Sequence, residues 1–160
     1  MEEIGHVKHN NLVKLLGYCA EGVYRMSVSE YVDNGNLHYW LHEFPGQVSP
    51  LTWTIRSNII HNVAKGLAYL HEENKPKILP GSIKSSTILL DENWNPNISD
   101  YGLAKLLSPE SSHILFCTCS SHVSTNTSIE GSDIYGFGVL MMEIISGKIH
   151  VLHSQLQGSL

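Results

Sequence analysis

Histidine and cysteine side chains that could bind a metal gather in one segment of the second half of the chain. His113, Cys117, Cys119 and His122 form the pattern H-x3-C-x-C-x2-H, and these side-chain types are the usual ligands of structural zinc. The C-x-C pair is tighter than the C-x2–4-C spacing of such sites, so we favour a segment without metal over a zinc site. Cys19 brings the cysteine count to three, an odd number that builds no disulfide framework and is typical of a reducing compartment.

The element with the strongest periodicity is a helix in the middle of the chain. Its apolar residues recur at steps of four, four, four and three, at Ile55, Ile59, Val63, Leu67 and Leu70. This spacing places them on one face of an amphipathic helix. We expect the helix to run from about Leu51 to Glu72.

A second helix is expected from Ser132 to Ser146, and it is apolar on nearly every side, which predicts that it is buried. Gly147 should end it, because glycine readily takes the left-handed conformation that follows many helices. Two short strands are expected between the helices, at Ile88–Leu90 and Asn97–Ser99.

The first third of the chain has the pattern of a β-hairpin followed by a short helix. Strand-like runs at Leu12–Cys19 and Val23–Val32 flank the turn Ala20-Glu21-Gly22, which predicts an antiparallel pair. Asn36 is a suitable N-terminal cap for a short helix from Leu37 to His42.

Composition and charge restrict the class of protein. The chain has 160 residues, 42% hydrophobic and 16% charged, as expected for one globular domain. Ten Lys and Arg against fifteen Asp and Glu give a net charge of -5, which offers no general attraction to nucleic acid or anionic lipid. The polar start is unlike a signal peptide, and no run approaches the roughly 20 apolar residues that span a bilayer. We therefore expect a soluble, cytoplasmic chain without a membrane segment or a nucleic-acid partner.

Five segments, taken in order, resemble a plant receptor-like serine/threonine protein kinase. They are HNNLVKLLGYC at 9–19, EYVDNGNLHYWLH at 30–42, IKSSTILLD at 83–91, SDYGLAKLL at 99–107 and SDIYGFGVLMMEIISGK at 132–148. An Asp-aromatic-Gly tripeptide alone is weak evidence, but five motifs in the order of the family are specific. The resemblance covers about residues 1–158, with one altered stretch near 113–130.

The resemblance implies an α+β, protein-kinase-like fold. It implies that about residues 33–160 form the core of the mostly helical large lobe, and that about residues 1–32 form a small-lobe remnant containing the hairpin. The family transfers phosphate from ATP to a hydroxyl, with magnesium as cofactor. Its glycine-rich loop, strand lysine and paired glutamate have no counterpart in these 160 residues, so the resemblance is to a truncated, degenerate kinase.

The catalytic loop departs from the family pattern H-R-D-x-K-x-x-N. In the same register, which begins at Pro80-Gly81, Ser82 replaces the aspartate that acts as general base, and Thr87 replaces the asparagine that binds magnesium. Lys84 matches the lysine that contacts the transferred phosphate. Because a serine hydroxyl is not a useful base at pH 7, we expect no catalysis.

Two aspartates also match family positions. Asp100, in Asp100-Tyr101-Gly102, matches the magnesium-binding aspartate, with Tyr101 in place of the usual phenylalanine. A single carboxylate without a phosphate clamp predicts weak magnesium binding. Asp133 resembles the aspartate that braces the backbone of the catalytic loop, which is a structural role.

The resemblance also locates an adenine-binding edge. Glu30, Tyr31 and Val32 match the hinge whose backbone groups bind adenine, and Leu89 matches the apolar floor of that pocket. Ser29 replaces a larger residue before the hinge, and the roof of the pocket would come from strands that precede this sequence. We expect ATP binding to be weak or absent.

Three functions remain open. The first is a pseudokinase-like module that binds a partner such as another receptor-like kinase. The second is an active or weakly ATP-binding receptor-like kinase, and the third is a truncated product without a selected role. Because family members cover both long helices with further structure, we expect exposed apolar surface here and therefore self-association.

Overall fold

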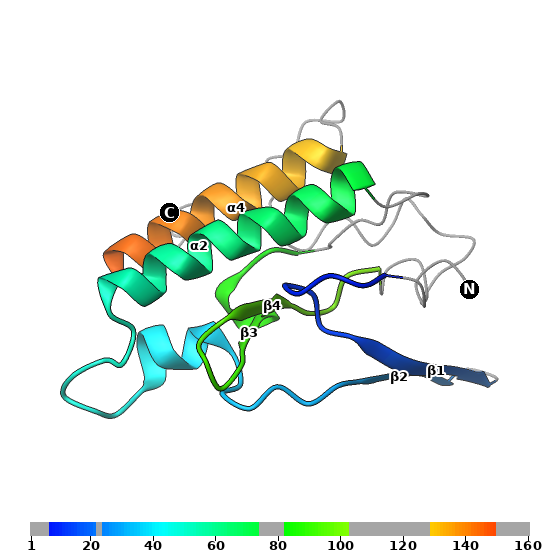
Figure 1. The fold of residues 1–160 in the computed structure, drawn as a ribbon, viewed down its shortest axis with the longest axis horizontal. Coiled ribbons are helices and arrows are strands. Elements are labelled where there is room, and N and C mark those ends of the chain that lie inside the picture. The colour runs from blue at the N-terminus through cyan, green and yellow to red at the C-terminus, as the bar shows by residue number, and fades with distance from the viewer. Residues whose placement is uncertain (1–6, 22–23, 74–81, 103–128, 150–160) are drawn as a thin grey trace, which may run out of the picture.

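The computed structural model describes residues 7–21, 24–73, 82–102 and 129–149. Two long helices lie side by side and antiparallel, and two small β-sheets lie on one side of them (Figure 1). The described elements follow one another as β1, β2, η1, α2, η2, η3, β3, β4 and α4. This is the α+β arrangement expected of part of a kinase-like fold.

The amphipathic helix predicted near the middle of the chain is confirmed as α2 (Trp53–Ala68), which continues into the wider helical turn η2 (Tyr69–Glu73). Thr52 is extended and its side chain accepts a hydrogen bond from the Ile55 N–H at 3.4 Å, so the helix begins after this cap rather than at Leu51. The predicted apolar stripe is buried, apart from a half-buried Ile55.

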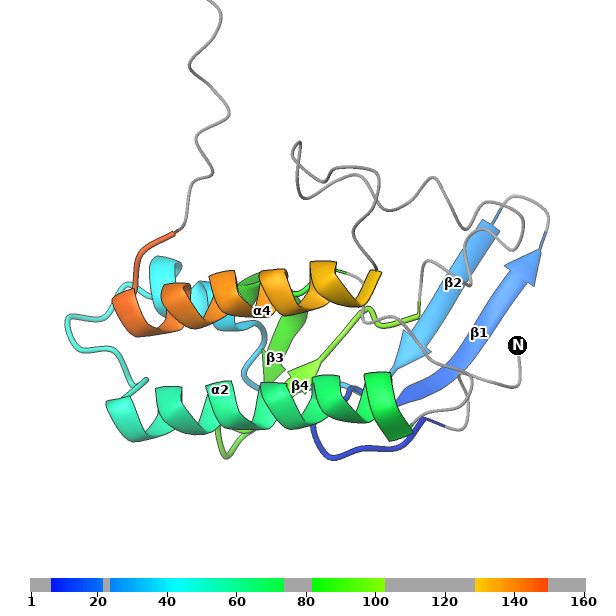
Figure 2. The ribbon, with the colours of Figure 1, turned by 90° about the horizontal axis from the view of Figure 1, so that it is seen from above.

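The second long helix is α4 (Ile129–Ser146), which starts three residues earlier than predicted. Gly147 ends it as expected, with φ +66° and its N–H bonded to the Glu143 carbonyl at 2.8 Å. Figure 2 shows α4 beside α2 along its whole length. The helix is not buried all round as its composition predicted: Leu140 and Ile144 face the core, whereas Ile134 is 65% exposed. Within the described part of the chain, the packing elements lie on one side of the helix only, and the other side remains open.

The small sheet next to α2 pairs β3 (Ile88–Leu90) with β4 (Pro96–Ile98) in antiparallel register. The second strand lies one residue earlier than predicted. Asp91 closes the connection: its Oδ1 accepts the N–H groups of Asn93 at 2.9 Å and Asn95 at 2.8 Å. The side chains of Ile88, Leu90 and Ile98 are fully buried beneath α2.

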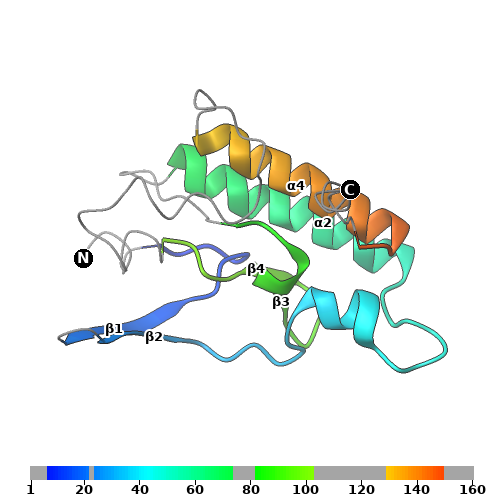
Figure 3. The same ribbon diagram turned by 180° about the vertical axis from the view of Figure 1, so that it is seen from behind.

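The predicted hairpin exists, but its first strand lies further along the chain than predicted and its second strand is shorter. It pairs β1 (Leu15–Glu21) with β2 (Tyr24–Ser29) and points away from both long helices (Figure 3). Leu12 and Val13 were expected in the first strand but are buried in the core instead, where the Val13 N–H donates to the Ile98 carbonyl at 3.0 Å. Among the described residues no third strand pairs with the hairpin.

The short predicted helix follows the hinge. Asn36 caps it as expected, because its Oδ1 accepts the Tyr39 N–H at 2.9 Å. The helical turns continue as η1 (Tyr39–Glu43), one residue further than predicted. The Trp40 indole N–H bonds to the Asn34 carbonyl at 2.6 Å and holds the helix against the hinge.

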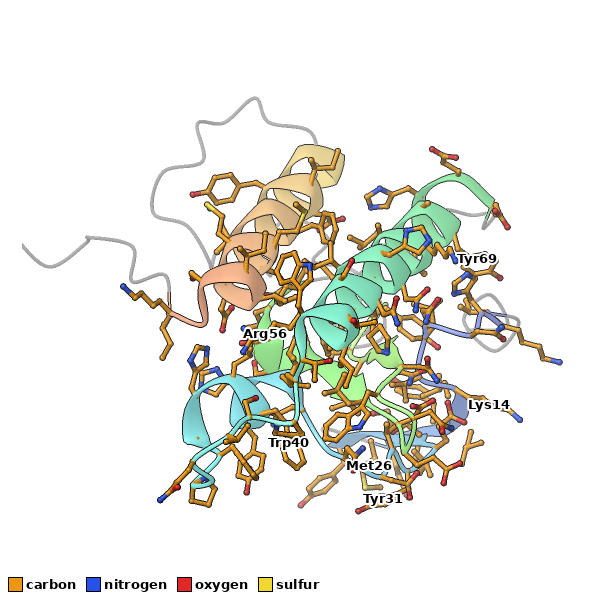
Figure 4. The ribbon with its side chains drawn as sticks, turned by 60° about the vertical axis from the view of Figure 1, so that its left-hand side comes forward. Lys14, Met26, Tyr31, Trp40, Arg56 and Tyr69 are labelled. Atoms are coloured by element: carbon orange, nitrogen blue, oxygen red, sulfur yellow. The ribbon has the colours of Figure 1, made fainter. Side chains whose placement is uncertain are left out.

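One hydrophobic core joins these elements. Its buried members come from the segment before β1, from the helices, from the small sheet and from the segments beside them: Val7, Leu12, Leu37, Leu51, Ile59, Val63, Leu67, Leu70, Ile83, Ile88, Leu90, Ile98, Tyr101, Leu140 and Ile144. Figure 4 shows Arg56 and Tyr69 near opposite ends of α2, with Met26 and Tyr31 on the side away from the long helices. Arg56 ties the helix pair together, since its guanidinium donates to the Ile144 carbonyl at 2.5 Å and to the Leu51 carbonyl at 3.0 Å.

We expect Gly66→Ala to lower the free energy of unfolding by up to about 2 kcal/mol, because overpacking a core costs about 1–3 kcal/mol while alanine regains up to about 1 kcal/mol of helix propensity. A Cβ at Gly66 would lie 2.9 Å from Ile98 Cδ1 and 3.2 Å from the Asn11 carbonyl oxygen. Gly138→Ala in α4 is the matched control, because nothing lies within 4 Å of its Cβ position; it should be stabilising by up to about 1 kcal/mol. Urea denaturation at pH 7 measures both, and a stabilised Gly66→Ala would contradict the close packing of α2.

Candidate nucleotide and catalytic site

The hinge segment is fixed at both ends by backbone hydrogen bonds. The Glu30 N–H donates to the Lys14 carbonyl at 2.9 Å, and the Glu30 carboxylate accepts the Lys14 N–H at 2.7 Å. Beyond the hinge, the Asn34 N–H donates to the Leu90 carbonyl at 2.9 Å. Gly35 takes φ +62° and accepts the Leu90 N–H at 2.8 Å, so the chain turns sharply here.

The side chains of the predicted adenine-binding edge differ in exposure. Val32 is buried, Leu89 is half-buried on β3, and Tyr31 is 85% exposed. Leu89 also forms an isolated β-bridge with Asn36, just after the hinge. The structure therefore brings the hinge and the predicted pocket floor into neighbouring segments.

The described part of the catalytic loop begins at Ser82, and Pro80 and Gly81 lie outside the described residues. The Ser82 and Lys84 side chains are exposed, whereas Thr87 is only 7% exposed. The Thr87 hydroxyl lies 2.9 Å from the Ser82 carbonyl and 3.0 Å from the Lys84 carbonyl, either of which can accept its proton. The same oxygen accepts the Lys84 N–H at 3.2 Å. The Thr87 hydroxyl thus both donates and accepts hydrogen bonds within its own loop.

Thr87 and Asp100 are brought together through Ser99. The Thr87 carbonyl accepts the Ser99 N–H at 2.9 Å and the Ser99 hydroxyl at 3.1 Å. Asp100 follows directly, with an exposed side chain and φ +61°, a conformation that aspartate tolerates better than most residues. The two predicted magnesium-site residues therefore lie on adjacent segments, but only the Asp100 carboxylate is exposed.

Tyr101 is anchored in the core instead of facing the site. Its side chain is 6% exposed, and its hydroxyl donates to the Val13 carbonyl at 2.5 Å. Burial raises the pKa of the Tyr101 phenol to about 12, with smaller contributions from the Glu30 carboxylate and from Tyr69. A phenylalanine at this position could not make the hydrogen bond.

Asp133, at the start of the described side chains of α4, is 2% exposed and lies 3.1 Å from His71 Nε2 through its Oδ2. This bond joins α4 to η2, so Asp133 has a structural partner that sequence reasoning did not identify. The expected contact with the loop at 80–81 falls outside the described residues, as do the candidate zinc ligands His113, Cys117, Cys119 and His122.

Sequence reasoning also missed a polar cluster on the other side of the catalytic loop. Glu143 Oε1 lies 2.7 Å from His42 Nε2 and accepts the Ser85 hydroxyl at 2.6 Å. His38 Nδ1 lies 3.2 Å from the same Ser85 hydroxyl. The detectable signal was the i, i+4 spacing of His38 and His42, which places two imidazoles on one face of a helical segment.

Comparison with known proteins extends over almost the whole chain. The family model described as protein tyrosine and serine/threonine kinase matches residues 1–157. A probable receptor-like serine/threonine-protein kinase of Arabidopsis thaliana is 50% identical, with 100% of this chain and 39% of the relative covered. A leucine-rich repeat receptor protein kinase of Oryza sativa subsp. japonica, MSP1, is 39% identical, with 99% of this chain and 13% of the relative covered. The chain thus spans well under half the length of the curated relatives it matches.

A solved structure supports the same resemblance. The pseudokinase domain of BIR2, described as an immune regulator of the RLK/Pelle family, is similar with a TM-score of 0.75 and 34% sequence identity. The match covers 96% of this chain and 46% of that chain. None of the described helices combines the length and apolar character needed to cross a membrane.

The raised pKa of Tyr101 predicts a loss of stability at high pH. The folded protein holds the phenolic proton more tightly than the unfolded chain, so this contribution is complete below pH 10 and is lost as the pH rises toward 12. Tyr101→Phe removes the titration and the bond to Val13, which should cost about 1 kcal/mol at neutral pH. Urea denaturation of both proteins from pH 7 to pH 11.5, spanning roughly the window set by these two values, should show their stability difference shrinking above pH 10. If the free energies of unfolding of the two proteins changed with pH in parallel, the buried hydrogen bond of Tyr101 would be contradicted.

Proposed function

Because the chain belongs to the protein tyrosine and serine/threonine kinase family and is related to plant receptor-like kinases, we propose that it is a pseudokinase-like domain that transfers no phosphate and acts by binding a partner kinase. The observation that carries the first half is the state of the catalytic loop. Ser82 stands at the position of the general base, and the Thr87 hydroxyl is engaged by carbonyls of its own loop.

The missing base alone accounts for a large loss of rate. A positioned general base contributes about 10²- to 10⁴-fold to catalysis. The Ser82 hydroxyl cannot take the substrate proton at neutral pH as a carboxylate does. With family turnover on the order of 1–100 per second, loss of the base leaves at most slow transfer before the metal site is considered.

The metal site is weakened by the geometry of Thr87. Kinases of this family use ATP with magnesium, and magnesium is held by one or two carboxylates together with substrate phosphates. Here Asp100 offers an exposed carboxylate, but the Thr87 side chain is buried and directed at the loop backbone. The Thr87 hydroxyl would have to give up its three hydrogen bonds within the loop to bind a metal. Asp100 would therefore bind magnesium with little contribution from Thr87.

Weak ATP binding is the second candidate function, and the hinge favours it. The backbone from Glu30 to Gly35 is held by bonds to Lys14 and Leu90, which supports a preformed edge where adenine could bind. Glu30, Val32 and Leu89 would contact the base, while Lys84 and Asp100 would face the phosphates and magnesium. We propose that this edge binds nucleotide weakly at most.

The partner-binding half of the proposal is supported by exposed apolar surface. On α4, Ile134, Met142 and Ile145 lie at spacings of eight and three, which places them on one face, and each is more than half exposed. Leu16, Met26 and Val28 of the hairpin are also exposed. Surfaces of this kind mark sites of protein association, and the similar BIR2 domain is a pseudokinase described as an immune regulator. Another receptor-like kinase is the partner we propose, with self-association as its alternative.

We predict no phosphate transfer from labelled ATP and magnesium to a generic protein substrate. The rate should equal that of Asp100→Ala, because a residual reaction would need the metal that this carboxylate binds. The double variant Ser82→Asp with Thr87→Asn restores the two side chains of the family pattern. If any of these proteins transfers phosphate above background, it should be this double variant and neither the unmodified chain nor Asp100→Ala.

One result would contradict the proposed inactivity, and another would contradict weak nucleotide binding. The first is transfer by the unmodified chain that disappears in Asp100→Ala. The second is a rise of several degrees in melting temperature with millimolar ATP and magnesium, because a ligand stabilises the folded state in proportion to its occupancy.

We also predict that the purified chain binds a hydrophobic dye and elutes above its monomer mass of 17.8 kDa. Ile134→Lys with Met142→Lys should shift the protein toward monomer, because charge on the exposed face of α4 opposes its burial. Thr54→Lys with Asn58→Lys adds the same charge to exposed positions of α2 and should leave association unchanged.

Co-expression with an intact receptor-like kinase domain tests the identity of the partner. A stable one-to-one complex that the α4 variant abolishes supports the proposal. A monomer that melts sharply and does not bind dye, or a complex insensitive to the α4 variant, would contradict the role of this face.

A further inference from the structure

His38, His42 and Glu143 form a convergent cluster outside the kinase site. The two histidines come from the helical turns around η1, and the glutamate comes from α4, a hundred residues later in the chain. One ligand atom from each lies within 4.8 Å of the other two. The side chains of His42 and Glu143 are each 10% exposed, and that of His38 is 31% exposed at the edge of the cluster.

The separations suit a small metal ion. Zinc binds imidazole nitrogen and carboxylate oxygen at about 2.0–2.2 Å, so tetrahedral ligands lie roughly 3.4 Å apart. Glu143 Oε1 lies 2.7 Å from His42 Nε2 and 3.9 Å from His38 Nδ1. These two separations bracket the tetrahedral value. The ligand atoms of the two histidines lie within 4.8 Å of each other, so the imidazoles would have to approach by up to about 1.4 Å to reach that value.

The surroundings orient the cluster as the outer shell of a metal site does. Glu43 Oε1 lies 3.6 Å from His38 Nε2, which favours a proton on that nitrogen. The lone pair of His38 Nδ1, which lies 3.2 Å from the Ser85 hydroxyl, would then turn to the cation. Ser85 donates to Glu143 at 2.6 Å and fixes its carboxylate. Lys84 lines the adjoining cavity of about 340 Å³, and its side chain is exposed, so solvent and salt screen its charge from the cluster.

We propose that His38, His42 and Glu143 bind a zinc ion, with a water from the adjoining cavity in the fourth position. Two imidazoles and one carboxylate form a ligand set that zinc uses with an open coordination position. Magnesium is disfavoured, because it prefers oxygen ligands and near-octahedral geometry. The ion would join η1, which follows the hinge, to α4 beside the catalytic loop. This inference is independent of whether the chain transfers phosphate.

A simpler interpretation is that the same residues form only a hydrogen-bonded contact between η1 and α4. The bond between His42 and Glu143 is sufficient for that role and does not need His38. The two interpretations therefore differ in the effect of removing His38. Under the zinc proposal its loss removes one of three ligands, whereas under the simpler one it changes no property of metal binding.

Zinc sulfate titration of the full chain tests the proposal, in a background where Cys19, Cys117 and Cys119 are replaced by serine. This background removes the thiolates that could bind zinc elsewhere. Competition with a chromophoric chelator should show one equivalent bound, and zinc should raise the melting temperature. His38→Ala and Glu143→Gln should each weaken binding by at least about tenfold, the lower end of the effect of losing even an outer-shell partner. His61→Ala, an exposed histidine on α2, is the control and should bind as the parent does.

Far-UV circular dichroism establishes that each variant is folded. If Glu143→Gln is not, His38→Ala decides the test, because it leaves the contacts among His42, Ser85 and Glu143 in place. Cobalt supplies a second measurement: its visible absorption should indicate four-coordination in the parent and be lost in His38→Ala. Absence of a bound equivalent in the parent, or unchanged zinc affinity in His38→Ala, would overturn the proposal.

Discussion

The structure depends on the close approach of α2 to the segment that precedes β1 and to β4. Gly66 makes this approach possible, since a Cβ there would meet Ile98 and the Asn11 backbone. Beneath it, the Ile98 N–H donates to the Asn11 carbonyl at 2.9 Å, and the Asn11 side chain donates to the Pro96 carbonyl at 3.0 Å. These bonds satisfy polar groups that would otherwise be buried without partners. The small sheet is in turn bonded to the catalytic loop through Thr87 and to the segment after the hinge through Leu90.

The candidate site retains the framework of a kinase while its chemical groups have changed. Backbone bonds from Thr87 to Ser99 and from Leu90 to the hinge hold the segments in place whatever the side chains are. Such bonds tolerate substitution, whereas a general base depends on one carboxylate. A chain could therefore fold as a member of its family without a carboxylate at Ser82, which is why the proposed loss of catalysis is compatible with the conserved fold.

The helix α4 serves two environments at once. Leu140 and Ile144 pack in the core, and Glu143 lies between them and the histidines of the turns around η1. The opposite face exposes Ile134 and Met142 to solvent. One helix thus carries the core contact, the polar cluster and an exposed apolar surface, so changes on each face can be made separately.

Local patterns in the sequence determined the elements and the family. The apolar steps from Ile55 to Leu70 were sufficient to locate α2, and Gly147 to end α4, because these signals act within a few residues. The five motifs in family order identified the family, and those around Lys84 and Asp100 predicted an altered catalytic loop. The strand limits were less well predicted, since Leu12 and Val13 have strand-like side chains but bury in the core instead.

Only the tertiary structure decided which side chains meet. The sequence placed Thr87 at a metal-ligand position, but its hydroxyl bonds to two carbonyls of its own loop. It marked Tyr101 as a substitution, but the bond to Val13 spans 88 residues. The contact of His42 with Glu143 spans 101 residues, and no local period could reveal it. Helix and turn signals come from neighbours along the chain, whereas exposure, hydrogen-bond partners and a metal-sized cluster arise only when distant segments pack together.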